Sequence, residues 1–132
     1  MAISYRLAPE HPFPAGFNDC YDVIRLVYSS SELLNIDPKN IVIMGDSAGG
    51  NLTAAVCQRA IDTKDFKVYK QILLYPALQS DYSKDTKYKS VIENGSSYII
   101  SRTQLCDFME HYVKNKEDLD NKYVAPLLSN NL

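Results

Sequence analysis

The chain has 132 residues, of which 45% are hydrophobic, 14 are Lys or Arg and 16 are Asp or Glu. This length accommodates a single domain, and the composition is that of an ordinary globular protein. The formal net charge is -2, and the sequence contains no block of basic residues. It therefore lacks the positive patch that binding to nucleic acid or to an anionic membrane surface requires. No apolar run reaches the roughly 18 residues that a bilayer-spanning helix needs.

The first half of the chain begins with elements that alternate between strand and helix. Residues 1–7 form a short apolar run that meets the proline-rich stretch 8–14, so we expect a strand followed by a rigid loop. Apolar side chains recur at three-and-four spacing within residues 17–28, which predicts an amphipathic helix of about four turns. A turn cluster precedes residues 41–44, a continuous apolar run that predicts a strand covered on both faces.

The alternation continues to residue 75. In residues 51–61 small side chains mark a helix face that can approach a sheet closely, and residues 71–75 predict a second covered strand. This order is typical of a parallel sheet with right-handed crossover helices, so the predicted fold class is α/β. Charge and Ser/Thr density rise over residues 79–121, and residues 99–116 have helical periodicity. We interpret 79–121 as an insertion or lid segment within one domain.

The insertion contains an apolar stripe that has two interpretations. Tyr98, Phe108, Met109 and Tyr112 could form the acyl pocket of a lid. Apolar residues at helical spacing are more often simple packing, which is the interpretation we adopt.

One motif in the sequence predicts chemistry. Gly45-Asp46-Ser47-Ala48-Gly49 matches Gly-x-Ser-x-Gly and lies between a predicted strand and a predicted helix, which is the context that this motif requires. A strand that reverses into a helix within one residue forces Ser47 into a strained backbone region, and small neighbours avoid the resulting clashes. The hydroxyl then projects outward, and the Ala48 amide points to where an oxyanion would form.

Other glycine-rich turns give alternative interpretations of this run. It could be a plain tight loop or a turn that cradles a phosphate. A P-loop is excluded because no Lys-Ser/Thr pair follows the glycines. The dinucleotide-binding motif Gly-x-Gly-x-x-Gly is excluded because the spacing of these glycines does not match it.

Four segments, in order along the chain, carry a resemblance to a known family. Residues 4–15 (SYRLAPEHPFPA) and 45–51 (GDSAGGN) resemble the hormone-sensitive-lipase-like branch of the α/β-hydrolases. Within it, residues 73–79 (LLYPALQ) and 124–128 (VAPLL) are most similar to the arylacetamide deacetylase group. The resemblance implies a partial α/β-hydrolase fold over residues 1–132.

The same resemblance implies roles for particular residues. Ser47 takes the role of nucleophile and Ala48 that of an oxyanion-hole amide, and the rest of the nucleophile elbow consists of Gly45, Asp46, Gly49 and Gly50. The implied function is a serine hydrolase that acts on small-molecule carboxylic esters or amides by acyl transfer, with no metal and no cofactor. The implied location is the endoplasmic reticulum membrane, whereas the residues themselves leave localisation open and a cytoplasmic location is the alternative.

The serine also needs a base and an orienting acid. His11 precedes Ser47 in the proline-rich loop, whereas the order in this fold is Ser, then Asp or Glu, then His. His111 falls among charged residues of a predicted helix, which is typical of a solvated position. We therefore expect neither imidazole to be the base.

The acidic candidates fail for geometric reasons. Asp46 is adjacent to Ser47 on a sharp turn, so the two side chains diverge. Asp81 and Asp85 follow the predicted strand 71–75 too closely to match the position of the acid in the resembled family. We expect no triad acid and no triad base in this chain.

The resemblance also implies a His-Gly-Gly-Gly loop, which this sequence lacks. In the resembled family, the strand that leads to this loop lies between the strand that ends near Arg6 and the strand that ends at Met44. We therefore interpret the chain as the central portion of a serine hydrolase with little or no turnover alone. The alternative is a catalytically inert fragment or module that binds a partner or self-associates through unpaired strands.

Two kinds of modification site need assessment. Cys20, Cys57 and Cys106 are too few and too dispersed for a disulfide framework or a zinc site, so we expect free thiols. Asn51 and Asn94 both lie in glycosylation sequons. A glycan on Asn51 would collide with the fold beneath the nucleophile, and we interpret the Asn94 sequon as a chance match.

Overall fold

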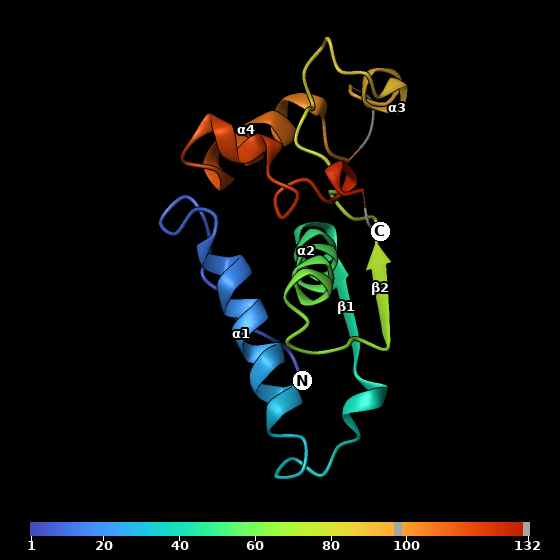
Figure 1. Cartoon of the computed structure of the whole chain (residues 1–132). Coiled ribbons are helices and arrows are strands. Elements are labelled where there is room, and N and C mark those ends of the chain that lie inside the picture. Colours follow the sequence, from blue (N-terminus) through green and yellow to red (C-terminus); the bar gives the residue numbers. More distant parts are fainter. Residues whose placement is uncertain (97–98, 131–132) are drawn as a thin grey trace.

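The computed structural model describes residues 1–96 and 99–130. Two parallel strands and the helix that connects them form its centre (Figure 1). The two strands pair in register from Val42 opposite Lys70 to Asp46 opposite Leu74. This arrangement confirms the α/β class with a crossover helix. The central elements, in chain order, are α1 (Ala15–Ser29), β1 (Val42–Asp46), α2 (Ser47–Thr63) and β2 (Lys70–Leu74).

Shorter elements surround this centre. The predicted insertion contains two helices, and the segment after it folds back towards α2 (Figure 1). The helices are α3 (Lys89–Glu93) and α4 (Arg102–Tyr112), and the short 3₁₀ helices are Pro38–Asn40, Lys116–Asp120 and Pro126–Leu128. No helix of residues 1–96 and 99–130 is long and apolar enough to cross a bilayer.

The predicted strand at residues 1–7 is wrong. These residues have no regular secondary structure, because a strand requires a ladder partner and none of the described residues provides one. Side-chain contacts hold the segment instead. Ile3 and Tyr5 pack against the core, and Arg6 binds Asp19 of α1.

The core lies between α1 and α2 rather than around a large sheet. Periodic apolar residues of α1 meet small and aliphatic residues of α2, as their spacing predicts. Arg59 of α2 lies 4.1 Å from the centre of the Tyr21 ring and donates to Asn18 Oδ1 at 2.8 Å. The buried cluster comprises Phe17, Cys20, Tyr21, Ile24, Leu52, Ala55, Val56, Ala60 and Phe66.

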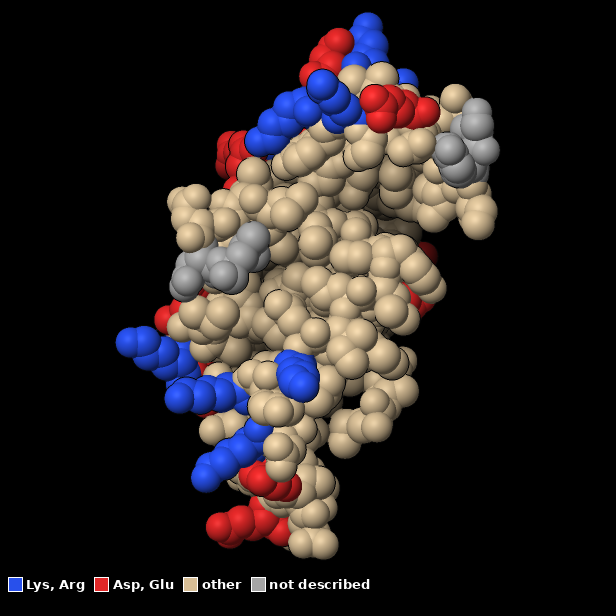
Figure 2. Space-filling model, turned by 90° about the vertical axis from the view of Figure 1, so that its right-hand side faces the viewer, with Lys and Arg blue, Asp and Glu red and all other residues tan. Residues whose placement is uncertain are grey.

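The expectation that β1 and β2 are covered on both faces is also wrong. Helix α2 covers one face, but on the other face the side chains of Val42, Met44, Ile72 and Leu74 are between 43% and 64% exposed. Figure 2 shows the side on which β2 lies, with uncharged residues across its middle and charged residues mostly towards its two ends. The exposed face exists because nothing among the described residues packs on it.

The apolar stripe of α4 is only partly packed. Val113 is buried, Met109 and Tyr112 are half-buried, and Phe108 is exposed, so the packing interpretation fails at Phe108. Tyr98 lies outside the described residues. The helix begins with a capping box in which Ser101 and Gln104 exchange hydrogen bonds. At its other end, the Tyr112 carbonyl accepts a 2.7 Å hydrogen bond from the Phe13 N–H.

The contact between Arg6 and Asp19 predicts a pH dependence. The backbone N–H of Arg6 and its guanidinium both donate to the Asp19 carboxylate, with a shortest distance of 2.7 Å, and these bonds lower the pKa of Asp19 to about 2. An acid whose pKa is lowered by folding stabilises the fold above its unfolded pKa of about 3.9. This contribution is lost as the pH falls through about 2.

We expect NMR titration of the Asp19 carboxyl carbon to show a midpoint near 2 in the wild type. In Arg6→Gln the midpoint should rise towards about 3.9. Arg25→Gln removes a guanidinium from the same helix that binds Asp22 instead, so it should leave the Asp19 midpoint unchanged. An Asp19 midpoint that is the same in Arg6→Gln as in the wild type would contradict the assignment.

Candidate active site

The nucleophile motif forms a sharp turn between strand and helix. Strand β1 ends at Asp46 and helix α2 begins at Ser47, with no residue between them. Ser47 has a φ of 50°, a left-handed conformation that is uncommon for any residue other than glycine. The strained backbone predicted for the serine is therefore present, and it lies at the carboxyl edge of the sheet.

Two glycines make this turn possible. A Cβ on Gly45 would overlap the carbonyl of Gly49 and lie 2.7 Å from Thr53 Oγ1. A Cβ on Gly50 would lie 2.9 Å from Pro76 Cβ. The space at Gly49 differs from the expectation, because a Cβ there would have only Asp46 Oδ1 near it, at 4.0 Å.

The loop after β2 lies against the same turn. The Ala77 N–H donates to the Ser47 carbonyl at 3.4 Å, and Tyr75, the residue that follows β2, also has a positive φ of 35°. Tyr75 is 76% exposed at this edge. Each of the two parallel strands is therefore followed directly by a residue with a positive φ, and both residues lie at the same edge of the sheet.

Asn51 has a role here that the sequence analysis missed. It is buried one turn after Ser47, and its side-chain amide donates to the Ala77 carbonyl at 2.6 Å and to the Val124 carbonyl at 2.8 Å. Both amide hydrogens are thus used to join α2 to two distant segments. Asn51 ends the 45–51 segment that carries the family resemblance, but that segment does not identify the partners of its side chain. This burial agrees with the rejection of Asn51 as a glycosylation site, whereas Asn94 is exposed at the end of α3.

Neither histidine is hydrogen-bonded to Ser47 in the part of the chain that the structure describes. His11 is exposed in the proline-rich loop, and His111 is exposed on α4. No hydrogen bond joins either imidazole to the Ser47 hydroxyl within residues 1–96 and 99–130. The geometry therefore shows a serine on a left-handed turn whose hydroxyl has no hydrogen bond from either imidazole among the described residues.

Among the described residues, the acidic candidates also form no hydrogen bond that would orient a base towards Ser47. Asp46 is exposed and is the N-cap residue of α2, but its carboxylate accepts no hydrogen bond from the first turn of the helix. Asp81 accepts from Ser83 within its own turn, an interaction that lowers the pKa of Asp81. Asp85 is exposed in the same loop. Each carboxylate is thus placed as a local turn or surface residue.

Burial makes two of the three thiols weak nucleophiles. Burial raises the pKa of Cys20 and of Cys57 to about 11, so both remain protonated at neutral pH. Cys106 is half-buried, and its thiol donates to the Tyr82 carbonyl. All three are free cysteines, as predicted.

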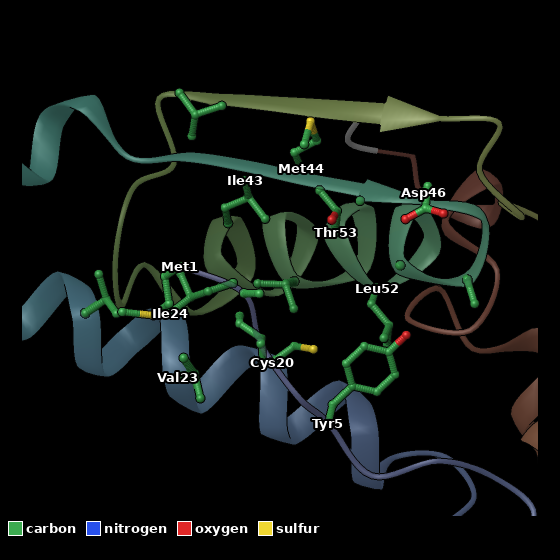
Figure 3. A pocket seen from close by; sticks show the side chains of 18 of the residues that line it. Met1, Tyr5, Cys20, Val23, Ile24, Ile43, Met44, Asp46, Leu52 and Thr53 are labelled. Atoms are coloured by element: carbon green, nitrogen blue, oxygen red, sulfur yellow. The ribbon is translucent and has the colours of Figure 1, made fainter.

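An elongated cavity of about 720 Å³ leads to the turn, and we call it the β1 groove (Figure 3). Residues 1–3 and Tyr5 form one side, and residues 41–46 form the other. Side chains of α1 and α2 form its floor, and Ser47, Ala48 and Gly49 lie at one end. One end of the groove therefore reaches Ser47, and most of its lining residues lie further from that side chain.

Comparison with known proteins now identifies the family. A family model described as the alpha/beta hydrolase fold matches residues 1–132. The chain belongs to the α/β-hydrolase family. It falls in the hormone-sensitive-lipase-like branch of that family.

Two curated relatives have sequences similar to that of this chain. It is 35% identical over 129 residues to carboxylesterase NlhH of Mycobacterium tuberculosis, covering 98% of this chain and 39% of that protein. It is 37% identical over 124 residues to arylacetamide deacetylase of Oryctolagus cuniculus, covering 91% and 30% respectively. The chain thus spans less than half the length of these relatives.

Solved structures of esterases have the same fold over the length of this chain, which again covers less than half of each of them. The thermostable carboxylesterase EstE1 from a metagenomic library matches with a TM-score of 0.85 and 32% identity, over 96% of this chain and 42% of that one. An esterase from the archaeon Pyrobaculum calidifontis matches with a TM-score of 0.86 and 33% identity, over 96% and 40%.

The glycine contacts predict a contrast between two substitutions in the elbow. Gly45→Ala places a methyl group against the Gly49 backbone, so we expect the free energy of unfolding to fall by about 1–3 kcal/mol or more. Gly49→Ala has room for the methyl group and adds a better helix former, so stability should rise by up to about 1 kcal/mol. Urea denaturation followed by circular dichroism measures both. Equal destabilisation by the two substitutions would contradict the described turn.

Proposed function

We propose that Ser47 is the nucleophile of a serine hydrolase that cleaves carboxylic esters or amides by acyl transfer. The observation that carries this proposal is the left-handed serine between β1 and α2, since a hydroxyl held on such a turn projects from the sheet edge. The names of the relatives, a carboxylesterase and an arylacetamide deacetylase, support the substrate class.

The chemistry would proceed in two steps. Ser47 Oγ attacks the substrate carbonyl carbon while a base accepts its proton, and negative charge develops on the carbonyl oxygen. Ala48 is the second residue of α2, and its N–H belongs to the first-turn amides that have no acceptor within the helix. This N–H would stabilise the oxyanion. The alcohol or amine then leaves with the proton, and water cleaves the acyl-enzyme.

The 132-residue chain is expected to perform this chemistry poorly by itself. This expectation is supported by the exposure of His11 and His111, neither of which is hydrogen-bonded to Ser47 among the described residues. A serine without its base loses on the order of 10⁴-fold or more in rate.

A fluorophosphonate probe tests both parts of this proposal. We expect slow modification of Ser47 on the purified chain, detected by peptide mass spectrometry at high probe concentration, and none in Ser47→Ala. Modification that persists unchanged in Ser47→Ala would contradict the assignment of the nucleophile. Labelling of Ser47 as fast as that of an intact serine esterase would show that a base acts on it within this chain.

A second function, self-association, is favoured by the exposed face of the sheet. Val42, Met44, Ile72 and Leu74 present contiguous apolar side chains on paired strands, and exposed apolar patches commonly mark interaction surfaces. We propose that two copies of the chain pack this face together. Such packing would remove apolar surface from water on both copies.

Sedimentation velocity tests this packing over a range of concentrations. We expect a concentration-dependent dimer in the wild type and a monomer in Ile72→Lys, because the substitution places a charge in the contact. Leu33→Lys changes an apolar residue that is 88% exposed in the turn after α1, so it should leave the dimer intact. A wild-type chain that stays monomeric, or dimers that Ile72→Lys does not weaken, would contradict the proposal.

A further inference from the structure

Two hydrogen bonds in series lead from the buried side chain of Asn51 to the backbone of Ser47. The Asn51 amide donates to the Ala77 carbonyl at 2.6 Å, and the Ala77 N–H donates to the Ser47 carbonyl at 3.4 Å. Asn51 and Ser47 lie one turn apart on α2, whereas Ala77 belongs to the loop after β2. The loop therefore bridges the side chain and the turn from outside the helix.

The position of the Ala77 N–H depends on Asn51. A distance of 3.4 Å is long for an N–H···O bond, so the contact with the Ser47 carbonyl is too weak to hold the loop by itself. Pro76 packs against Gly50, but apolar packing has no direction. The short bond from Asn51 to the carbonyl of Ala77 has both strength and direction.

The Asn51 side chain is itself held rigidly. Asn51 is only 4% exposed, and its amide also donates to the carbonyl of Val124 at 2.8 Å. Val124 is fully buried. Rotation of the amide would leave buried carbonyl oxygens without a donor, which is costly away from water. Asn51 is therefore a fixed donor rather than an adaptable one.

The direction of the Ser47 carbonyl determines the direction of the Ala48 N–H. Both groups belong to one peptide plane, and among the described residues cis peptide bonds occur only before Pro9 and Pro14. In a trans peptide the carbonyl and the N–H point in opposite directions. A donor that restrains the Ser47 carbonyl on one side therefore also restrains the Ala48 N–H on the other.

This restraint acts where α2 has the fewest bonds of its own. The first-turn amides of a helix have no acceptor within it, and helix ends fray. The side chain of Asp46, the N-cap residue, accepts no hydrogen bond from them. The contact from Ala77 consequently adds a restraint from outside the helix to the first peptide plane of α2.

We propose that Asn51 is a positioning residue for the oxyanion amide of Ala48. It holds Ala77 against the Ser47 carbonyl, and it thereby aims the Ala48 N–H at the negative charge that develops when a carbonyl group is attacked. Asn51 acts through Ala77 and touches neither the substrate nor the reacting atoms. The role rests on the proposed function, because the oxyanion forms only when residue 47 attacks a carbonyl group.

The test compares two reactions of one thiol, placed by Ser47→Cys in the 132-residue chain. A free thiol ionises without a neighbouring base at a pH of about 8.5. With p-nitrophenyl acetate, the sulfur bonds to the acetyl carbon through an oxyanion and p-nitrophenolate leaves. With iodoacetamide, the sulfur bonds to a saturated carbon and iodide leaves, so no oxyanion forms. The ratio of the two rates at residue 47, measured by peptide mass spectrometry, reports the oxyanion contact separately from the exposure and pKa of the thiol.

Two substitutions in the Ser47→Cys background break the link at different points. Asn51→Ala should lower the ratio of acylation to alkylation about tenfold, less than the loss on the order of 10²–10³-fold that removal of an oxyanion donor causes. Ala77→Pro removes the N–H that binds the carbonyl of residue 47 but keeps a carbonyl for Asn51. It should therefore lower the ratio by a similar factor.

Gln58→Ala is the matched control. Gln58 is 3% exposed and lies two turns after Asn51 on α2, where it donates to Asp62 and accepts from Ser129. Its removal should lower the melting temperature, because buried hydrogen bonds are lost. The ratio of the two rates should stay unchanged, because Gln58 has no contact with the loop that holds Ala77.

Circular dichroism melting establishes which variants are folded before their rates are compared. An unchanged ratio in folded Asn51→Ala or Ala77→Pro, or an equal decrease in Gln58→Ala, would overturn the proposal. Hydrogen exchange followed by NMR needs no variant. The Ala77 N–H of the wild type should exchange more slowly than in an unstructured peptide, and equal rates would also overturn the proposal. A fluorophosphonate that never modifies Ser47 would count against the proposed function alone, because the thiol reactions need no serine.

Discussion

The close approach of α2 to the end of β1 is the constraint on which the site depends. The two elements meet where Gly45 faces the backbone of Gly49, at a separation that no side chain on Gly45 would permit. This contact allows the chain to reverse from strand to helix at Ser47, and the reversal holds that residue at a φ of 50°. Strain at such a residue persists only when its surroundings over-determine it.

Those surroundings are distant in sequence but adjacent in space. Asn51 binds carbonyls 26 and 73 residues away, and Gly50 lies against Pro76. The segment that contains Val124 is further anchored because the hydroxyl of Tyr123 donates to Asp62 of α2 at 2.7 Å. The helix that begins with Ser47 is thus held along much of its length, which fixes the position of this residue relative to the loop after β2.

Local features of the fold could be predicted from the sequence, because they depend on neighbouring residues. The apolar periodicity of residues 17–28 predicts most of α1, and the Gly-x-Ser-x-Gly motif predicts the junction of β1 and α2. The left-handed backbone of Ser47 could be predicted for the same reason, because the motif encodes a backbone conformation.

Features that depend on distant partners could not be predicted in this way. Residues 1–7 have the composition of a strand but no ladder partner among the described residues, and they are held by the ion pair of Arg6 and Asp19. Phe108 continues an apolar stripe on α4 but is 54% exposed. Asn51 resembles any polar residue of a helix until its two acceptors are known.

The distribution of the core explains how Ser47 is held in place although residues 1–96 and 99–130 contain only two paired strands. Two-stranded sheets are marginal by themselves, and here one face of the pair is exposed. The buried aromatic and aliphatic residues lie mainly between α1 and α2, so the helix that positions Ser47 is stabilised by its neighbouring helix more than by the sheet. The position of the serine therefore depends on contacts between helices and loops that the described residues already make, and it does not require a large sheet.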